Sequence, residues 1–179
     1  MSTLPNTNYT EVIMNWMMRK VQPDDAEAVA GILNSIIETG LYTALDTPFT
    51  IEAEREFITN FPQRGVFHVA VHPENQRIVG FQNVEPFATY THAFDHVGII
   101  GTYVDRSVHR QGVATGLFEA TFEAMRQNGY EKVFAYVRGD NLGAIGTYLK
   151  QGFRIIGSAQ NHAKIKGKYI DEVLIEKVL

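Results

Sequence analysis

The sequence predicts a mixed α/β fold: one domain with a central mixed, mainly antiparallel sheet of about seven strands and helices on both faces. Three observations support this prediction. Segments with the period of two that is typical of strands are interspersed with segments whose apolar residues recur every three or four positions. A run of three strands separates two groups of helices, and the chain ends in a strand pair. Its 179 residues suit one domain, and no repeat or linker divides them.

The first helix, over about 24–39, is the most clearly marked element. Asp24 can accept hydrogen bonds from the open backbone amides, and Glu27 follows three residues later, where a capping box needs it. Gly40 supplies the stop. Its apolar face consists of Val29, Ile32, Leu33, Ile36 and Ile37. We expect a strand from about Met17 before this helix, and a short helix over 51–60 after it.

The middle of the chain is expected to form a hairpin. Residues 66–71 alternate and are rich in β-branched side chains, and the polar turn 72–76 leads back into 77–87. Apolar periodicity and stops at glycine mark the elements that follow. These are strands over 97–104 and 132–137, helices over 112–128 and 141–151, and a strand pair from Phe153 joined at 166–168.

Composition excludes several classes of function. Hydrophobic residues make up 45% and charged residues 20%, as in globular proteins. The absence of cysteine excludes a disulfide framework, a thiolate zinc site and a cysteine nucleophile. A net charge of −4 with scattered Lys and Arg argues against nucleic acid as a partner. Without a membrane-length apolar run or a signal-peptide pattern, we expect a soluble, cytoplasmic protein that does not bind membranes. Residues 1–16 are expected to be a flexible extension before a domain over 17–179.

The segment 102–118 indicates an anion site at the start of a helix. A strand ends at Val104, a short polar loop follows, and a helix begins in the residues HRQGVA at 109–114. Helix N-termini present unpaired N–H groups and a partial positive charge. Gly112 and Ala114 keep the backbone bare for a phosphate, and Arg110 and Gln111 add donors. The alternative is that these small residues only let the helix pack on the sheet.

A second segment, NLGAIGTYLKQGF at 141–153, makes the interpretation specific. The pair of segments resembles the acetyl-CoA site of the GNAT superfamily of N-acetyltransferases. The two family patterns read roughly Q/R-x-x-G-x-G/A and N-x-x-A-x-x-x-Y-x-x-x-G-F, separated, as here, by one helix and one strand. Over most of the domain, from RKVQPDDAEAVAGILNSII to the closing strand pair, the chain is similar to the phosphinothricin acetyltransferase branch.

This resemblance implies a GNAT-like fold, acetyl-CoA as co-substrate, no metal, and a homodimer. It also implies transfer of an acetyl group to the primary amine of a small molecule, an amino acid or an analogue, by direct attack of the amine on the thioester. Two alternatives stay open. The chain could acetylate protein N-termini or lysines, or it could be a regulatory module that binds acyl-CoA without turnover.

Each site residue follows from its match to the family patterns. Tyr148 resembles the general acid that donates to the CoA sulfur, and Asn141 resembles the residue that binds the pantetheine arm. Val104 would offer its backbone to the pantetheine amides, with its strand splayed by a bulge. The expected CoA contacts are Tyr103, Val104, His109, Arg110, Gln111, Gly112, Val113, Ala114, Thr115, Asn141 and Tyr148. Structural roles compete: Tyr148 could be a core tyrosine, and Asn141 a helix cap.

Three residues depart from the phosphinothricin branch and argue against phosphinothricin itself as substrate. They are His109 for the usual Gln or Arg, Ile99 for a Glu, and Tyr148 for a frequent His. Ile99 leaves the general base open. The candidates are Glu85, Asp95, His96 or a water relay, of which Glu85 and His96 are preferred. His92 and His96 without further ligands do not predict a metal site. The acceptor side is expected to be walled by Tyr42, Phe49, Phe87, Tyr90 and Phe94.

Overall fold

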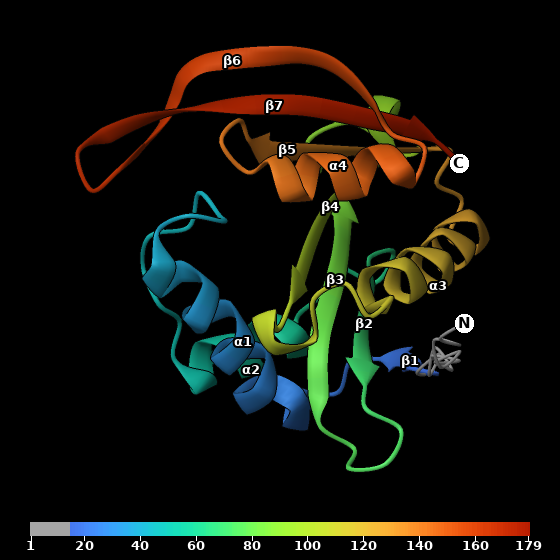
Figure 1. Cartoon of the computed structure of the whole chain (residues 1–179). Coiled ribbons are helices and arrows are strands. Elements are labelled where there is room, and N and C mark those ends of the chain that lie inside the picture. The colour runs from blue at the N-terminus through green and yellow to red at the C-terminus, as the bar shows by residue number, and fades with distance from the viewer. Residues whose placement is uncertain (1–14) are drawn as a thin grey trace, which may run out of the picture.

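Alternating apolar side chains build a seven-stranded sheet within residues 15–179, the part of the chain that this computed structural model describes (Figure 1). The order of the strands is β1-β2-β3-β4-β5-β7-β6, and of these neighbours only β4 and β5 run parallel. The strands are β1 (Met17–Lys20), β2 (Val66–Val71), β3 (Ile78–Pro86), β4 (Val97–Val104), β5 (Lys132–Arg138), β6 (Arg154–Ile165) and β7 (Lys168–Val178). The predicted mixed, mainly antiparallel sheet is confirmed.

The α-helices lie within one or two residues of the predicted limits. They are α1 (Ala26–Thr39), α2 (Ile51–Thr59), α3 (Val113–Gln127) and α4 (Leu142–Lys150), and short 3₁₀ turns occur at η1 (Pro23–Asp25), η2 (His92–Phe94) and η3 (Arg106–Val108). Gly40 adopts the left-handed conformation, with φ of 67°, directly after α1. Glycine takes this conformation without strain, so α1 ends where the sequence predicts.

The start of α1 differs from the prediction. Asp24 does not cap the helix: its carboxylate is exposed and lies 3.1 Å from the Arg55 guanidinium. The Asp25 carboxylate instead accepts a hydrogen bond of 2.7 Å from the backbone N–H of Gln22, and it also pairs with Arg19. The turn η1 precedes the helix and brings the Asp25 carboxylate back onto the incoming chain. Asp25 is therefore the residue directly before α1, one position later than predicted, and its side chain makes no capping hydrogen bond with α1.

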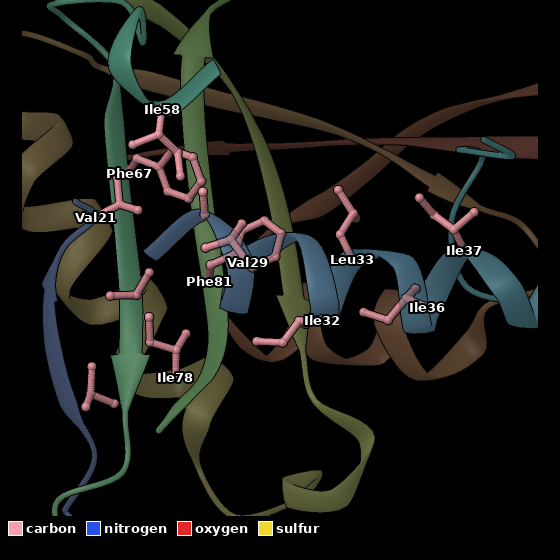
Figure 2. Close-up of a cluster of buried hydrophobic side chains, with 13 residues drawn as sticks. Val21, Val29, Ile32, Leu33, Ile36, Ile37, Ile58, Phe67, Ile78 and Phe81 are labelled. Atoms are coloured by element: carbon pink, nitrogen blue, oxygen red, sulfur yellow. The ribbon is translucent and has the colours of Figure 1, made fainter. Parts of the chain in front are cut away.

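Helices cover both faces of the sheet. On one face, the apolar residues of α1 and Ile58 of α2 pack on Phe67 of β2 and Phe81 of β3 (Figure 2). On the other face, α3 buries Leu117, Phe118 and Met125 against the sheet, and α4 joins the cluster around Phe118. Both helical layers are amphipathic and bury one face, as the periodicity predicts.

The sheet divides between β4 and β5. These strands pair over three residues only, Val97–Ile99 with Lys132–Phe134. Beyond this point β4 stays with β3, and β5 stays with β7 as far as Arg138. In Figure 1, β3 and β4 run vertically, whereas β5, β7 and β6 run horizontally across the top. The twist natural to strands favours such a divergence once the pairing stops.

The register of β3 and β4 assigns their side chains to the two faces. Gln82 and Thr102 are Cα partners, as are Glu85 and Ile99. Side chains alternate along a strand, so Gln82 and Thr102 share the face of α3 and α4. Glu85 and Ile99 share the face of α1 and α2, with Tyr103, which packs against the α1 cluster.

The expected extension over residues 1–16 falls mostly outside the described residues. Trp16 belongs to the described part, and its Nε1 donates a hydrogen bond of 2.7 Å to the Gln111 carbonyl. Its ring also meets His72 edge-on, with centroids 5.5 Å apart. The domain boundary between 16 and 17 stays a prediction. Within residues 15–179, no helix has the length and apolarity that crossing a membrane requires.

Candidate active site

A cleft of about 1250 Å³ opens where β4 and β5 separate. One wall is the β4 segment 99–104, and α4 contributes the other on the face that it shares with α3. The residues before α3, the loop 42–45 after α1 and side chains of β3, β5 and β7 also line it. The cleft therefore reaches residues of both faces of the sheet, and the split in the sheet is what connects them.

The start of α3 is built to hold an anion. The first backbone hydrogen bond of this turn runs from the Gly116 amide to the Gly112 carbonyl, at 3.1 Å. The six amides of 110–115 have no acceptor within the described residues. Arg110 and Gly112 are left-handed, with φ of 64° and 84°, a geometry that forms anion-binding concavities. The space beside Gly112 is open, since a Cβ there would meet nothing within 4 Å.

Most of the predicted CoA contacts lie at the cleft. They are Tyr103, Val104, His109, Arg110, Gly112, Ala114, Thr115, Asn141 and Tyr148. Gln111 and Val113 do not line it. The Val113 side chain is buried against β2, β3 and α3, so only its backbone can serve an anion. The Gln111 carbonyl is held by Trp16, and its side chain lies outside the cleft lining.

Tyr148 of α4 is buried, with 6% of its surface exposed, and lines the cleft. Its ring meets Phe118 and Phe153 edge-on, at centroid distances of 5.2 and 5.0 Å. Its hydroxyl lies 3.0 Å from Thr102 Oγ1 on β4. Burial raises the pKa of Tyr148, although the hydrogen bond with Thr102 opposes that shift. The phenol therefore keeps its proton at neutral pH and is available as a donor.

Asn141 and Val104 are already engaged by the protein. Asn141 caps α4, because its Oδ1 accepts from the Ala144 amide at 3.1 Å. Its Nδ2 donates to the Tyr42 carbonyl at 3.1 Å, which fastens the loop after α1 to α4. The Val104 carbonyl lies 3.1 Å from His109 Nε2. The expected bulge in β4 is wrong: its register with β3 is continuous, and the opening arises because β5 turns away.

The opposite end of the cleft, on the face of α1 and α2, carries Glu85. This side chain lines the cleft beside Asn83, and burial raises its pKa. Tyr103 lies on the same face, and burial raises its pKa too, with smaller contributions from Glu54 and Glu85. A carboxyl group with a raised pKa is suited to accept a proton near neutral pH.

His96 is not brought into the cleft. It lies exposed in the turn before β4, and its carbonyl accepts from the amides of Glu131 and Lys132. Asp95 is engaged by Arg64 and His92. Within residues 15–179, no three His, Cys, Asp or Glu side chains are grouped to hold a metal ion. Glu85 is the candidate base that the fold places at the cleft.

Of the aromatic residues expected on the acceptor side, only Tyr42 lines the cleft in the described chain. Phe87 and Phe94 pack against each other with ring centroids 5.4 Å apart, and Phe87 also meets Phe134. Tyr90 is 84% exposed. Phe49 lies outside the lining, and its backbone is held by Asn34. These residues fill loops, whereas Tyr42 is fixed at the cleft through its hydrogen bond with Asn141.

Sequence reasoning missed Thr102 and Gln82, which adjoin Tyr148. Gln82 Nε2 donates to Thr102 Oγ1 at 2.8 Å, and Gln82 is fully buried. A polar residue at an inward position of an apolar strand was the available signal. The register between β3 and β4, which brings the two side chains together, is not readable from the sequence.

Comparisons with known proteins agree on one family. A model described as the acetyltransferase (GNAT) family matches residues 34–153. YwnH of Bacillus subtilis (strain 168) is 25% identical over 162 residues, covering 90% of this chain and 98% of that protein. The phosphinothricin N-acetyltransferase of Streptomyces coelicolor (strain ATCC BAA-471 / A3(2) / M145) is 22% identical over 158 residues, covering 87% and 92%.

Solved structures share the fold. The GNAT superfamily phosphinothricin acetyltransferase (Pat) from Sinorhizobium meliloti, solved in complex with AcCoA, superimposes with a TM-score of 0.84 at 18% identity. The match covers 93% of this chain and 89% of that one. The fold therefore extends over nearly the whole described chain and beyond the region that the family model matches.

Proposed function

The chain belongs to the acetyltransferase (GNAT) family, and from this premise we propose that it transfers the acetyl group of acetyl-CoA to the primary amine of a small molecule. An amino acid or an amino-acid analogue is the acceptor that the relatives suggest, since one of them is named a phosphinothricin N-acetyltransferase. The observation that supports the proposal best is the row of six backbone amides at 110–115 that have no acceptor within residues 15–179, at the edge of the same cleft as Tyr148.

The start of α3 supplies the binding energy for the phosphates. The free amides of 110–115 can each donate to a pyrophosphate oxygen, and the helix dipole favours the negative charge. The part of β4 that is not paired with β5 leads from this loop into the cleft. Its backbone can hold the pantetheine arm. The acetyl group would then lie at the split between β4 and β5, accessible from the face that carries Glu85.

Glu85 and Tyr148 serve the two proton transfers of the reaction. The amine must lose a proton before its nitrogen bonds to the acetyl carbon, and Glu85 accepts that proton directly or through water. As the carbon–sulfur bond breaks, its electron pair goes to sulfur, to which Tyr148 donates a hydrogen bond or its proton. No cysteine is available to carry the acetyl group, which favours direct attack.

Thiol release tests the proposal. We expect acetyl-CoA together with a suitable amine to release free CoA thiol faster than acetyl-CoA alone, across a panel of amino acids, amino-acid analogues and simple amines. Peptides with free N-termini or lysines form the second arm of the panel. A release that occurs only with peptides would move the acceptor to proteins. Tight CoA binding without thiol release in the presence of any acceptor would indicate a module that binds CoA without turnover.

A further inference from the structure

A short row of polar side chains runs from the buried Gln82 through the half-buried Thr102 and ends at the hydroxyl of Tyr148. Gln82 of β3 has no exposed surface, and its Nε2 lies 2.8 Å from Thr102 Oγ1. Thr102 Oγ1 in turn lies 3.0 Å from the Tyr148 hydroxyl. The row crosses from β3 to β4 to α4, and its last member, Tyr148, belongs to an apolar cluster that includes Phe118 and Val84. Polar groups are costly in such surroundings unless they are paired.

Donors and acceptors in this row can be counted. An amide nitrogen only donates, so Thr102 Oγ1 accepts from Gln82. Thr102 still has one hydrogen, and its remaining described partner is the Tyr148 oxygen. If Thr102 donates to Tyr148, the phenolic hydrogen of Tyr148 has no acceptor in the row and is free to point into the cleft. The reverse direction would turn the Tyr148 hydrogen away from the cleft toward β4.

Gln82 also carries an unusual cost. Its Oε1 is buried and has no hydrogen-bond partner within the described residues. A glutamine that only filled space would be replaceable by an apolar residue of similar volume without leaving an unpaired oxygen. Fixing the direction of the Thr102 hydroxyl is a role that an apolar residue cannot perform.

We propose that Gln82 and Thr102 are positioning residues that orient the hydroxyl of Tyr148, so that its hydrogen is directed into the cleft toward the departing sulfur. This inference rests on the proposed acetyl transfer and deepens it. Gln82 lies outside the cleft lining, whereas Thr102 lines the cleft beside Tyr148. Both act through Tyr148, which donates the hydrogen while Thr102 donates to the phenolic oxygen and stabilises the negative charge that develops there.

The test is a set of Thr102 variants assayed with acetyl-CoA and the best amine acceptor. Thr102→Val keeps the shape and removes the hydroxyl, and it should lower kcat about tenfold or more. The KM for acetyl-CoA should stay within about twofold, because the loop before α3 is untouched. Thr102→Ser restores the hydroxyl and should bring kcat back to within about threefold of wild type. Gln82→Met should resemble Thr102→Val.

Thr121→Val is the matched control. Thr121 of α3 is fully buried, whereas Thr102 is half-buried, and the Thr121 hydroxyl lies 3.1 Å from His68 Nδ1. It does not line the cleft within the described chain. Removing this hydroxyl should lower the melting temperature as Thr102→Val does and leave kcat unchanged. An equal fall in kcat for both variants would mean that the loss reflects general loosening of the core.

A double variant decides whether Thr102 acts through Tyr148. In a Tyr148→Phe background, Thr102→Val should lower kcat no further, because the group that it orients is gone. Equal factors in both backgrounds, or an unchanged kcat in Thr102→Val alone, would overturn the inference while acetyl transfer stands. A wild-type protein that binds CoA but releases no thiol with any amine or peptide would instead refute the proposed function and the inference together.

Discussion

Tyr148 is held by Phe118 and Phe153, so replacing it with Phe preserves the ring packing and removes one hydroxyl. If that hydroxyl assists departure of the thiol, kcat should fall by about 10²–10⁴-fold, the range typical of general acid catalysis. The KM for acetyl-CoA should hardly change. Steady-state kinetics with the best acceptor measures both. A kcat within about threefold of wild type would return Tyr148 to a packing role.

Protonation of Glu85 should produce the acid limb in the pH profile of kcat/KM. A base works only when deprotonated, and burial raises the pKa of Glu85. Activity should therefore fall as pH decreases through that raised pKa, which lies above the usual value of about 4.3. We expect kcat/KM to show this limb in the wild type and Glu85→Gln to lose both the limb and most of the rate.

Glu172→Gln is the control for Glu85. Glu172 lies on β7 and also lines the cleft. Its replacement removes the same charge without removing the proposed base, so the acid limb should persist. Comparable losses of kcat/KM in the two variants would indicate that the cleft needs negative charge to attract a cationic acceptor. Glu85 would then have no specific part in proton transfer.

At the level of single residues, the sequence predicted those sites that a local pattern defines. Gly112 and Tyr148 belong to contiguous segments whose spacing fixes their place on a helix, and both line the cleft. Thr102 and Gln82 meet only because β3 and β4 pair in one register. That register depends on long-range packing, which no local pattern records. His96 was a poor candidate because proximity in sequence to β4 does not determine the direction of a turn.

At the level of elements, the loop before α3 can be tested with two glycines. Gly112→Val forces a branched side chain into the left-handed region and blocks the open side of the loop. We expect the KM for acetyl-CoA to rise about tenfold or more, since the loop can no longer place its amides on the pyrophosphate. Isothermal titration with CoA would measure the same loss at equilibrium.

Gly129→Val provides the matched control. Gly129 has φ of 81° against 84° for Gly112, and a Cβ at either position would meet nothing within 4 Å. The backbone strain is therefore similar, but Gly129 follows the far end of α3, away from the cleft. It should lower stability without affecting CoA affinity. Unchanged CoA affinity in a folded Gly112→Val protein would remove this loop from the binding site.

Element limits were predictable to within one or two residues, but the split between β4 and β5 was not. Periodicity and glycine stops are local signals, and they placed β4 and α3 closely. The length over which two strands pair depends on sheet twist and on the competing partner, here β7 for β5. The opening was expected from a bulge in β4, a local feature, and the structure opens the cleft without one.

At the level of the whole molecule, we propose a homodimer, which the similarity to the phosphinothricin branch motivates. Exposed apolar side chains on β6 and β7, among them Ile155, Ile156 and Tyr169, are compatible with such an interface. Sedimentation velocity at micromolar concentrations should give twice the mass of the 20.1 kDa chain. A single species with the mass of one chain at these concentrations would contradict the proposal.

The central claim is that both substrates meet in one cleft and react directly. Initial rates measured while acetyl-CoA and the amine are both varied test it most directly. Direct attack requires a ternary complex, so the double-reciprocal plots should intersect, and no acetylated enzyme should form with acetyl-CoA alone. Parallel lines together with an acetyl-enzyme detected by mass spectrometry would show a covalent intermediate and contradict the account.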